Sequence, residues 1–335
     1  MPIKLEALVG ILPVLTFLAA LLYLDSYKLL RPRSVIAVVG LGALAAIAGY
    51  VTNAALLPAL NIDLSAYSRY VAPLIEEAWK GVIIVVLLRT HRIGFLVDAA
   101  IYGFAAGAGF ALVENMHFLG MIPDAGIGTW IVRGFGTAIM HGGATALFAV
   151  IGLTMSERGK WHGPLAFLPG FALASVLHSG FNHLSAYPRL ATLAPFLIVP
   201  LLCWVVFERS EKATRDWLGT GFDADAEMLA LINSGELAES SLGSYLFTLK
   251  DKFKGPAVAD ILCYLRLHTE LAMRAKGILM MRQNGFDPPV DAETRDKFTE
   301  MRYLEGSIGK TGLLAIQPML HVSRKDLWQM YMLGK

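Results

Sequence analysis

Long apolar runs separated by short polar breaks make up the first two thirds of the chain. A helix needs about 20 mostly apolar residues to cross a bilayer. Seven stretches meet or approach this length: residues 5–24, 35–57, 71–88, 97–120, 131–155, 163–186 and 190–207. The first stretch follows a single lysine, Lys4, beside the acidic Glu6, and its apolar run to Leu24 is longer than that of a usual signal peptide, so we expect a retained spanning helix.

The pattern changes after residue 208, where charged residues become frequent and apolar residues recur at helical spacing. We expect one helix to begin at Asp223 and others to cover residues 256–281, 291–304 and 324–333. The sequence therefore predicts an all-α protein in two parts. Residues 1–208 form a polytopic membrane helix bundle of about seven spans, and residues 209–335 form an all-helical C-terminal cytoplasmic domain.

Composition agrees with this division. Hydrophobic residues make up 55% of the chain and charged residues 17%, whereas soluble domains carry roughly 25% charged residues. The net charge of +2 gives no indication of nucleic-acid binding. Cys203 and Cys263 lie far apart and form neither a disulfide pattern nor a metal-binding pattern. The surroundings that these features predict are those of a lipid bilayer.

The distribution of basic residues predicts the orientation, because cytoplasmic loops are enriched in Lys and Arg. One set of loops holds ten basic residues: Lys28, Arg31, Arg33, Arg89, Arg92, Arg158, Lys160, Arg209, Lys212 and Arg215. The opposite set holds four, namely Lys4, Arg69, Arg133 and Arg189. We expect the first set to be cytoplasmic, which places the N-terminus outside and the C-terminal domain in the cytoplasm.

Four of the expected spans carry polar side chains that are costly to bury in lipid. These side chains are Glu76, Glu77 and Lys80 in the third span, Glu114 and Asn115 in the fourth, His141 and Thr145 in the fifth, and His178 and Asn182 in the sixth. At 1.5 Å per residue, the key carboxylates and imidazoles all lie about 10–15 Å from the outer ends of their helices. Four helices therefore place these groups at one level, in the outer half of the bilayer.

Two hydrolytic mechanisms fit this set of residues. In one, a glutamate is the general base for a water molecule, a histidine assists it, and Asn182 donates to the oxyanion. In the other, His141, His178 and a glutamate such as Glu77 bind Zn²⁺ and leave a position open for water. Lys80 lies three residues after Glu77 and four after Glu76, so it can pair with either. Its charge would oppose a dication, which favours the metal-free mechanism.

Other functions use buried polar groups too. A single His in a membrane helix is more often structural than catalytic, and a single Glu is as often structural or part of an ion pathway as catalytic. The convergence of four helices favours a functional site. A transporter or proton-linked channel that uses the same carboxylates is the alternative, although the polar groups gather near one face without a polar path inward. A non-catalytic scaffold that recruits a partner through residues 209–335 is a third possibility.

The polar residues occur in an order that resembles the PrsW family of intramembrane proteases, within the wider group that includes the CAAX prenyl endopeptidases and Abi proteins. The matching motifs lie between residues 71 and 186. They are Glu76-Glu77-x-x-Lys80, Asp98 through Gly107 and Gly109 to Glu114-Asn115, Arg133 with His141 and Thr145, and Leu177-His178 with Asn182. One position departs from the pattern, because Phe118 stands where a tyrosine is expected.

The resemblance implies a multi-pass intramembrane endopeptidase of glutamic or metallo type, in a bacterial inner membrane. Its substrates would be single-pass membrane proteins, such as anti-sigma factors in regulated proteolysis. Glu76, Glu77, His141 and His178 would be the catalytic set, assisted by Glu114 and Asn182. Lys80, Asn115, Arg133 and Thr145 would support them. We expect Glu77 or Glu76 to activate water with His141 or His178, and Lys80 to tune the two glutamates.

Overall fold

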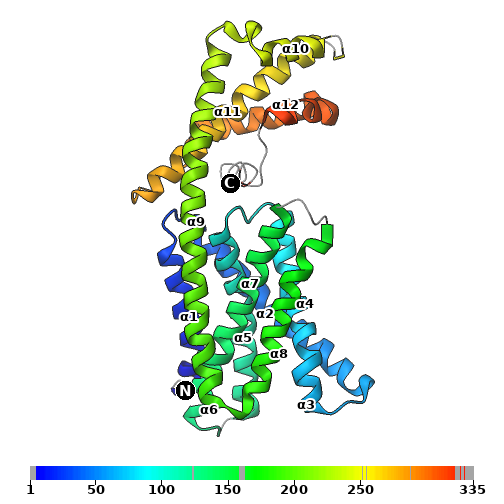
Figure 1. Ribbon diagram of the computed structural model, residues 1–335, viewed down its shortest axis with the longest axis vertical. Helices are drawn as coiled ribbons and strands as arrows, with labels where there is room; N and C mark the ends of the chain where they lie inside the picture. Colours follow the sequence, from blue (N-terminus) through cyan, green and yellow to red (C-terminus); the bar gives the residue numbers. More distant parts are fainter. Residues whose placement is uncertain are drawn as a thin grey trace. The chain divides into compact units, whose positions relative to one another are not determined.

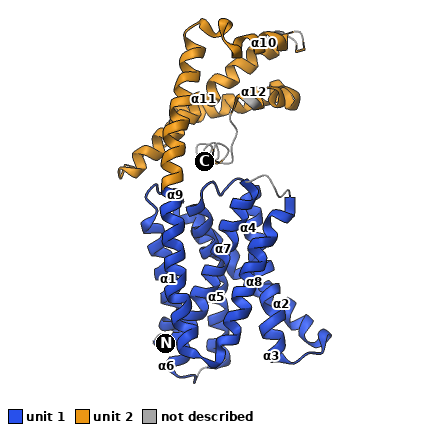
Figure 2. Ribbon diagram, in the orientation of Figure 1, with its two compact units in different colours: residues 1–211 blue, residues 212–335 orange. Residues whose placement is uncertain are grey.

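The computed structural model of the chain describes residues 5–122, 124–157, 163–250, 252–253, 255–286 and 288–320, together with Lys325 and Trp328. The regular structure of these residues is helical throughout, without a strand (Figure 1), which confirms the all-α prediction. Two compact units, residues 1–211 and 212–335, are separated by a boundary within the long helix α9, Pro188–Asn233 (Figure 2). This boundary lies close to the predicted one, and the separate roles of the two parts stay predictions.

The first unit is a bundle of long helices joined by short ones. The long helices are α1 (Leu5–Leu24), α2 (Pro32–Leu60), α4 (Ala72–Arg89), α5 (Leu96–Met121), α7 (Ala138–Glu157), α8 (Leu168–His183) and the first part of α9. The short ones are α3 (Leu64–Ala66), α6 (Ile127–Ile131), the π-helices η1 (Tyr67–Val71) and η2 (Val132–Thr137), and the 3₁₀ turns η3 (Gly163–Phe167) and η4 (Leu184–Ala186). Each π-helix runs directly into a helix that carries candidate site residues.

Six helical segments of the described chain are long and apolar enough to cross a membrane. They are Leu5–Leu24, Pro32–Leu60, Leu96–Met121, Ile127–Glu157, Gly163–Ala186 and Pro188–Asn233. The protein is therefore a multi-pass membrane protein, as the sequence predicts. The remaining predicted span, 71–88, forms α4, whose charged residues keep it outside this apolar set. That α4 also crosses the bilayer stays a prediction.

Helix α5 lies at the centre of the first unit and packs against α1, α2, α4 and α7. Its residues from Val97 to Ala111 are all buried. Most of these residues are glycine or alanine. Such small residues allow neighbouring helix backbones to approach closely. At Gly107, an added Cβ would collide with the backbone carbonyl of His141 on α7. The absence of a side chain at Gly107 therefore sets how near His141 lies to α5.

Helix α4 has two different faces. Its buried residues include Glu77, Lys80, Ile84 and Leu88, which recur every three or four residues and form one stripe. The opposite face exposes Trp79, Val82 and Val86, which suits contact with lipid. The polar residues of α4 consequently point toward the protein interior, as expected for charged groups in a membrane helix.

The second unit contains the end of α9 with α10 (Ser241–Lys250), α11 (Gly255–Gln283), α12 (Ala292–Ile316) and the 3₁₀ turns η5 (Glu236–Glu239) and η6 (Gln317–Met319). Helix α11 confirms the prediction for residues 256–281. The predicted helix start at Asp223 is wrong, because this residue lies inside α9. There the helix continues past Gly221 and is held by an ion pair between Asp225 and the buried Lys276. The predicted helix at 324–333 lies almost wholly outside the described residues.

Candidate active site

A cavity of about 1190 Å³ opens into the first unit beside the predicted catalytic residues. Its wall combines apolar side chains of α2, α5 and η2 with a polar patch from η1, α4, α5, α7 and α8. The predicted site residues that line it are Glu76, Glu114, Arg133, His141, His178 and Asn182. An apolar cavity with a few convergent polar groups is the usual form of a binding site.

Glu76 is the glutamate of the pair that lines the cavity. Its Oε1 accepts a hydrogen bond from Asn53 Nδ2 of α2 at 3.3 Å, and Tyr67 Oη of η1 donates to Asn53 Oδ1 at 2.9 Å. Its Oε2 lies 3.7 Å from His178 Nε2. The carboxylate is therefore fixed from α2 and faces the imidazole of α8.

Glu77 faces the protein interior instead. Its Oε1 lies 2.5 Å from Lys80 Nζ and 2.9 Å from His178 Nδ1. The Lys80 side chain is fully buried and its ammonium also lies over the Phe110 ring. Such a buried charge requires a close counterion, and Glu77 supplies it. The i, i+3 spacing thus places Lys80 with Glu77 and not with Glu76.

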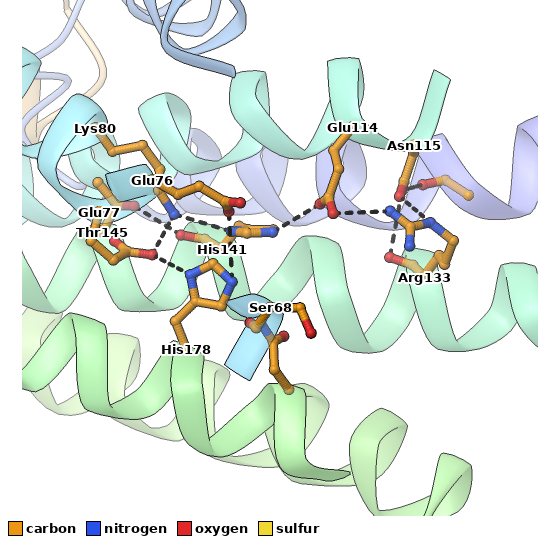
Figure 3. A network of polar contacts seen from close by, with 12 residues as sticks. Ser68, Glu76, Glu77, Lys80, Glu114, Asn115, Arg133, His141, Thr145 and His178 are labelled. Carbon is orange, nitrogen blue, oxygen red and sulfur yellow. Dashed lines mark hydrogen bonds and ion pairs between the residues drawn. The ribbon is translucent and has the colours of Figure 1, made fainter. Parts of the chain in front are cut away.

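A chain of polar contacts runs from His141 across the bundle (Figure 3). His141 Nδ1 lies 3.0 Å from Lys80 Nζ, and His141 Nε2 lies 2.9 Å from Glu114 Oε2. Glu114 Oε1 in turn lies 3.4 Å from Arg133 Nη2. Arg133 Nε donates to Asn115 Oδ1 at 2.9 Å, and Asn115 Nδ2 donates to the Gly10 carbonyl of α1 at 2.7 Å. Residues from α1, α5, η2 and α7 thereby fix the position of Glu114.

Glu76, His141 and His178 form a group that fits a metal ion. One ligand atom from each lies within 4.8 Å of the others, and two histidines with one glutamate are a known ligand set of catalytic zinc. The Nδ1 atom of His178 lies against Glu77, so its Nε2 is directed to the group. A carboxylate behind a metal-binding histidine fixes its ring and raises its basicity. The carboxylate of this group is Glu76, whereas the sequence suggested Glu77 as the ligand.

Two other predicted residues contact the backbone. Asn182 Nδ2 donates to the Ser68 carbonyl of η1 at 2.7 Å, so one of its two amide N–H groups is engaged. Thr145 Oγ1 donates to the His141 carbonyl at 2.9 Å, one turn earlier in α7. Among the described residues, neither side chain hydrogen-bonds to the side chain of a candidate glutamate or histidine. Both help to hold the segments that carry the site.

Three residues near the site were not predicted from the sequence: Asn53, Tyr67 and Ser179. Asn53 is a polar residue within an apolar span, which is the signal used for the other spans and could have identified it. Tyr67 and Ser179 gave no such signal, because they contact the site through Asn53 and through the η1 backbone. His117 of α5 also lines the cavity.

The fold is that of a multi-pass membrane protein, with carboxylate and imidazole side chains gathered at the wall of a cavity. A family model described as "PrsW family intramembrane metalloprotease" matches residues 31–207, which is more than half of the chain. The chain belongs to the PrsW family and is an intramembrane metalloprotease, a peptide hydrolase. No curated protein and no solved structure matches the chain.

Family membership confirms the enzyme prediction over the transporter and scaffold alternatives. It also bears on the mechanism, since the family is described as metalloproteases, whereas the charge of Lys80 favoured a metal-free site. In the structure this charge is paired with Glu77 and therefore opposes a dication less than the sequence suggested.

Proposed function

We propose that this protein cleaves a peptide bond in the membrane segment of single-pass membrane proteins, with Glu76, His141 and His178 holding the catalytic metal. The observation that carries the proposal is the three-residue group at the wall of the cavity. The metal supplies Lewis-acid activation of water and of the scissile carbonyl. Zn²⁺ is the metal we propose, because its catalytic sites use this ligand set.

The protein residues around the group have distinct roles in this proposal. Glu77 holds His178 by its Nδ1 atom, and Lys80 balances the charge of Glu77. Glu114 is the further carboxylate at the cavity wall and takes the proton of the attacking water, which it then gives to the leaving amine. Arg133 and Asn115 keep Glu114 in place. The second N–H of Asn182 donates to the oxyanion.

The cavity supports a membrane-embedded peptide as substrate. Its apolar walls, provided in part by Ile47, Leu57 and Val132, suit the side chains of a transmembrane segment. Hydrolysis requires an accessible backbone, so the segment would be unwound near the cleaved bond. Anti-sigma factors, which are single-pass proteins, are the physiological substrates we propose. The bacterial inner membrane is the location this implies.

Cleavage of a synthetic single-pass peptide tests the proposal. The purified chain and its Glu114→Gln and His178→Ala variants are reconstituted in vesicles with the peptide, and products are identified by mass spectrometry. Both variants should lose at least about 100-fold in rate, the lower range for loss of a proton-transfer group. Gly120→Ala, at an exposed position of α5 with open space around it, is the control. Wild-type rates in both variants would refute the proposed site.

A further inference from the structure

The charged side chains that line the cavity are paired, with one exception. Glu76 faces His178 at 3.7 Å, and Glu114 lies between Arg133 and His141. Arg69 of η1 also lines the cavity and is partly buried. Within the described residues it makes no ion pair and no side-chain hydrogen bond. A partly buried guanidinium without a counterion is a site for an anion.

The backbone at Arg69 is fixed to the neighbouring helix. Ser179 Oγ of α8 donates to the Arg69 carbonyl at 2.6 Å, and Asn182 Nδ2 donates to the adjacent Ser68 carbonyl at 2.7 Å. These two side chains come from the helix that also carries His178. The position of Arg69 relative to the metal-binding group is therefore set by α8, as a selective binding site requires.

We propose that Arg69 is a specificity residue that binds the carboxylate of an aspartate or glutamate in the substrate. This inference rests on the proposed function. Arg69 precedes Glu76 by seven residues, which is about 10 Å along a helix. An extended peptide advances about 3.3 Å per residue, so the acidic residue would lie about three residues from the cleaved bond.

The phosphate of a lipid headgroup carries the same charge and is the competing source of an anion. The two sources of the anion can be distinguished by what the cleavage rate depends on. A substrate carboxylate makes cleavage depend on the peptide sequence in a neutral membrane. A lipid phosphate makes it depend on the charge of the membrane and not on the peptide.

The experiment uses full-length protein in phosphatidylcholine vesicles and a synthetic single-pass peptide whose cleavage position has been mapped. Each of the five residues on either side of the cleaved bond is changed in turn to Asp and, as a control, to Asn. In the wild type, Asp at a position about three residues from the bond should raise kcat/KM about tenfold over Asn. In Arg69→Gln this preference should disappear. In Arg69→Glu, a peptide with Lys at the same position should be cleaved faster than the Asp peptide. Arg189→Gln, at an exposed position outside the cavity, should keep the wild-type preference.

Equal rates for Asp and Asn peptides at every position would overturn the inference, and so would a preference that persists in Arg69→Gln. The inference would also be overturned if added phosphatidylglycerol changed the rate of the wild type but not of Arg69→Gln, while the charge of the peptide had no effect. Binding of the labelled peptides to the Glu76→Gln variant is measured in parallel. If binding prefers Asp through Arg69 while wild type cleaves no peptide, the inference stands and the proposed function fails.

Discussion

Glu76 and Glu77 are neighbours in sequence with different surroundings. Glu76 lines the cavity and belongs to the group that fits a metal, whereas Glu77 is buried between Lys80 and His178. One helical step of about 100° separates these surroundings. In our proposal Glu76 is therefore a metal ligand, while Glu77 is the buried counterion of Lys80.

This difference predicts that Glu76→Gln chiefly affects metal binding and that Glu77→Gln chiefly affects stability. Glu76→Gln should release the metal but leave the fold nearly unchanged. Glu77→Gln leaves Lys80 buried without its counterion, which costs about 3–5 kcal/mol for buried pairs. Metal content is measured by elemental analysis. Thermal unfolding in detergent is measured with a chelator present, so that bound metal does not add stability. A Glu76→Gln variant that unfolds earlier than Glu77→Gln would contradict this assignment.

Among the helices, the distance between α5 and α7 determines where His141 lies. Gly107→Ala adds a Cβ against the His141 carbonyl, and overpacking of this kind costs about 1–3 kcal/mol. We expect a lower unfolding midpoint and weaker metal binding. Gly120→Ala on the same helix meets open space, and alanine favours a helix over glycine by up to about 1 kcal/mol. Equal unfolding midpoints for the two variants would show that the close approach is unimportant.

In the second unit, Lys297 of α12 links to α11. Its Nζ lies 2.9 Å from Glu270 Oε2, and Arg266 Nε lies 3.0 Å from Glu270 Oε1. Burial raises the pKa of Glu270, but the hydrogen bonds from Lys297 and Arg266 outweigh it and hold the pKa below its usual value. Hydrogen bonds to Glu293 and Glu270 raise the pKa of Lys297.

The stabilisation from these groups follows from the signs of the two shifts. Glu270 contributes above its ordinary pKa of 4.5 and loses its contribution as the pH falls. Lys297 contributes below its ordinary pKa of 10.5 and loses its contribution as the pH rises. Lys297→Ala should therefore speed hydrogen exchange in α12 at neutral pH by a few-fold, since partly exposed pairs contribute at most about 1 kcal/mol. At pH 3 the difference should shrink. The exposed Lys310 makes no ion pair among the described residues, so Lys310→Ala is the control. If Lys297→Ala and Lys310→Ala changed hydrogen exchange in α12 equally, the ion pairs of Lys297 would not stabilise the helix.

For the whole molecule, the sequence predicted more of the fold than of the site's internal connections. Apolar runs located the membrane helices, and polar interruptions such as His141 and His178 indicated the candidate site, because burial of such groups in lipid is costly. Which of Glu76 and Glu77 faces the cavity depends on the rotation of α4 about its axis, and tertiary packing sets this rotation. The contact of Asn182 with the Ser68 carbonyl depends on a π-helix that has no clear sequence signal.

The orientation in the membrane is a further prediction at this scale. We expect Tyr187→Cys, at an exposed position between α8 and α9, to react with an impermeant maleimide in intact cells. The natural exposed cysteine, Cys263, should react only after the membrane is permeabilised. The buried Cys203 should react in neither case. If Cys263 reacted in intact cells and the cysteine at position 187 only after permeabilisation, the protein would have the opposite orientation.

A joint measurement of bound metal and peptide cleavage on one purified preparation tests whether cleavage depends on a metal held by Glu76, His141 and His178. We expect about one Zn²⁺ per chain, loss of cleavage when a chelator removes it, and recovery when Zn²⁺ is restored. His178→Ala should lose both metal and cleavage together, while Gly120→Ala keeps both. Metal-free protein that cleaves the peptide at an undiminished rate would contradict a metal-dependent mechanism.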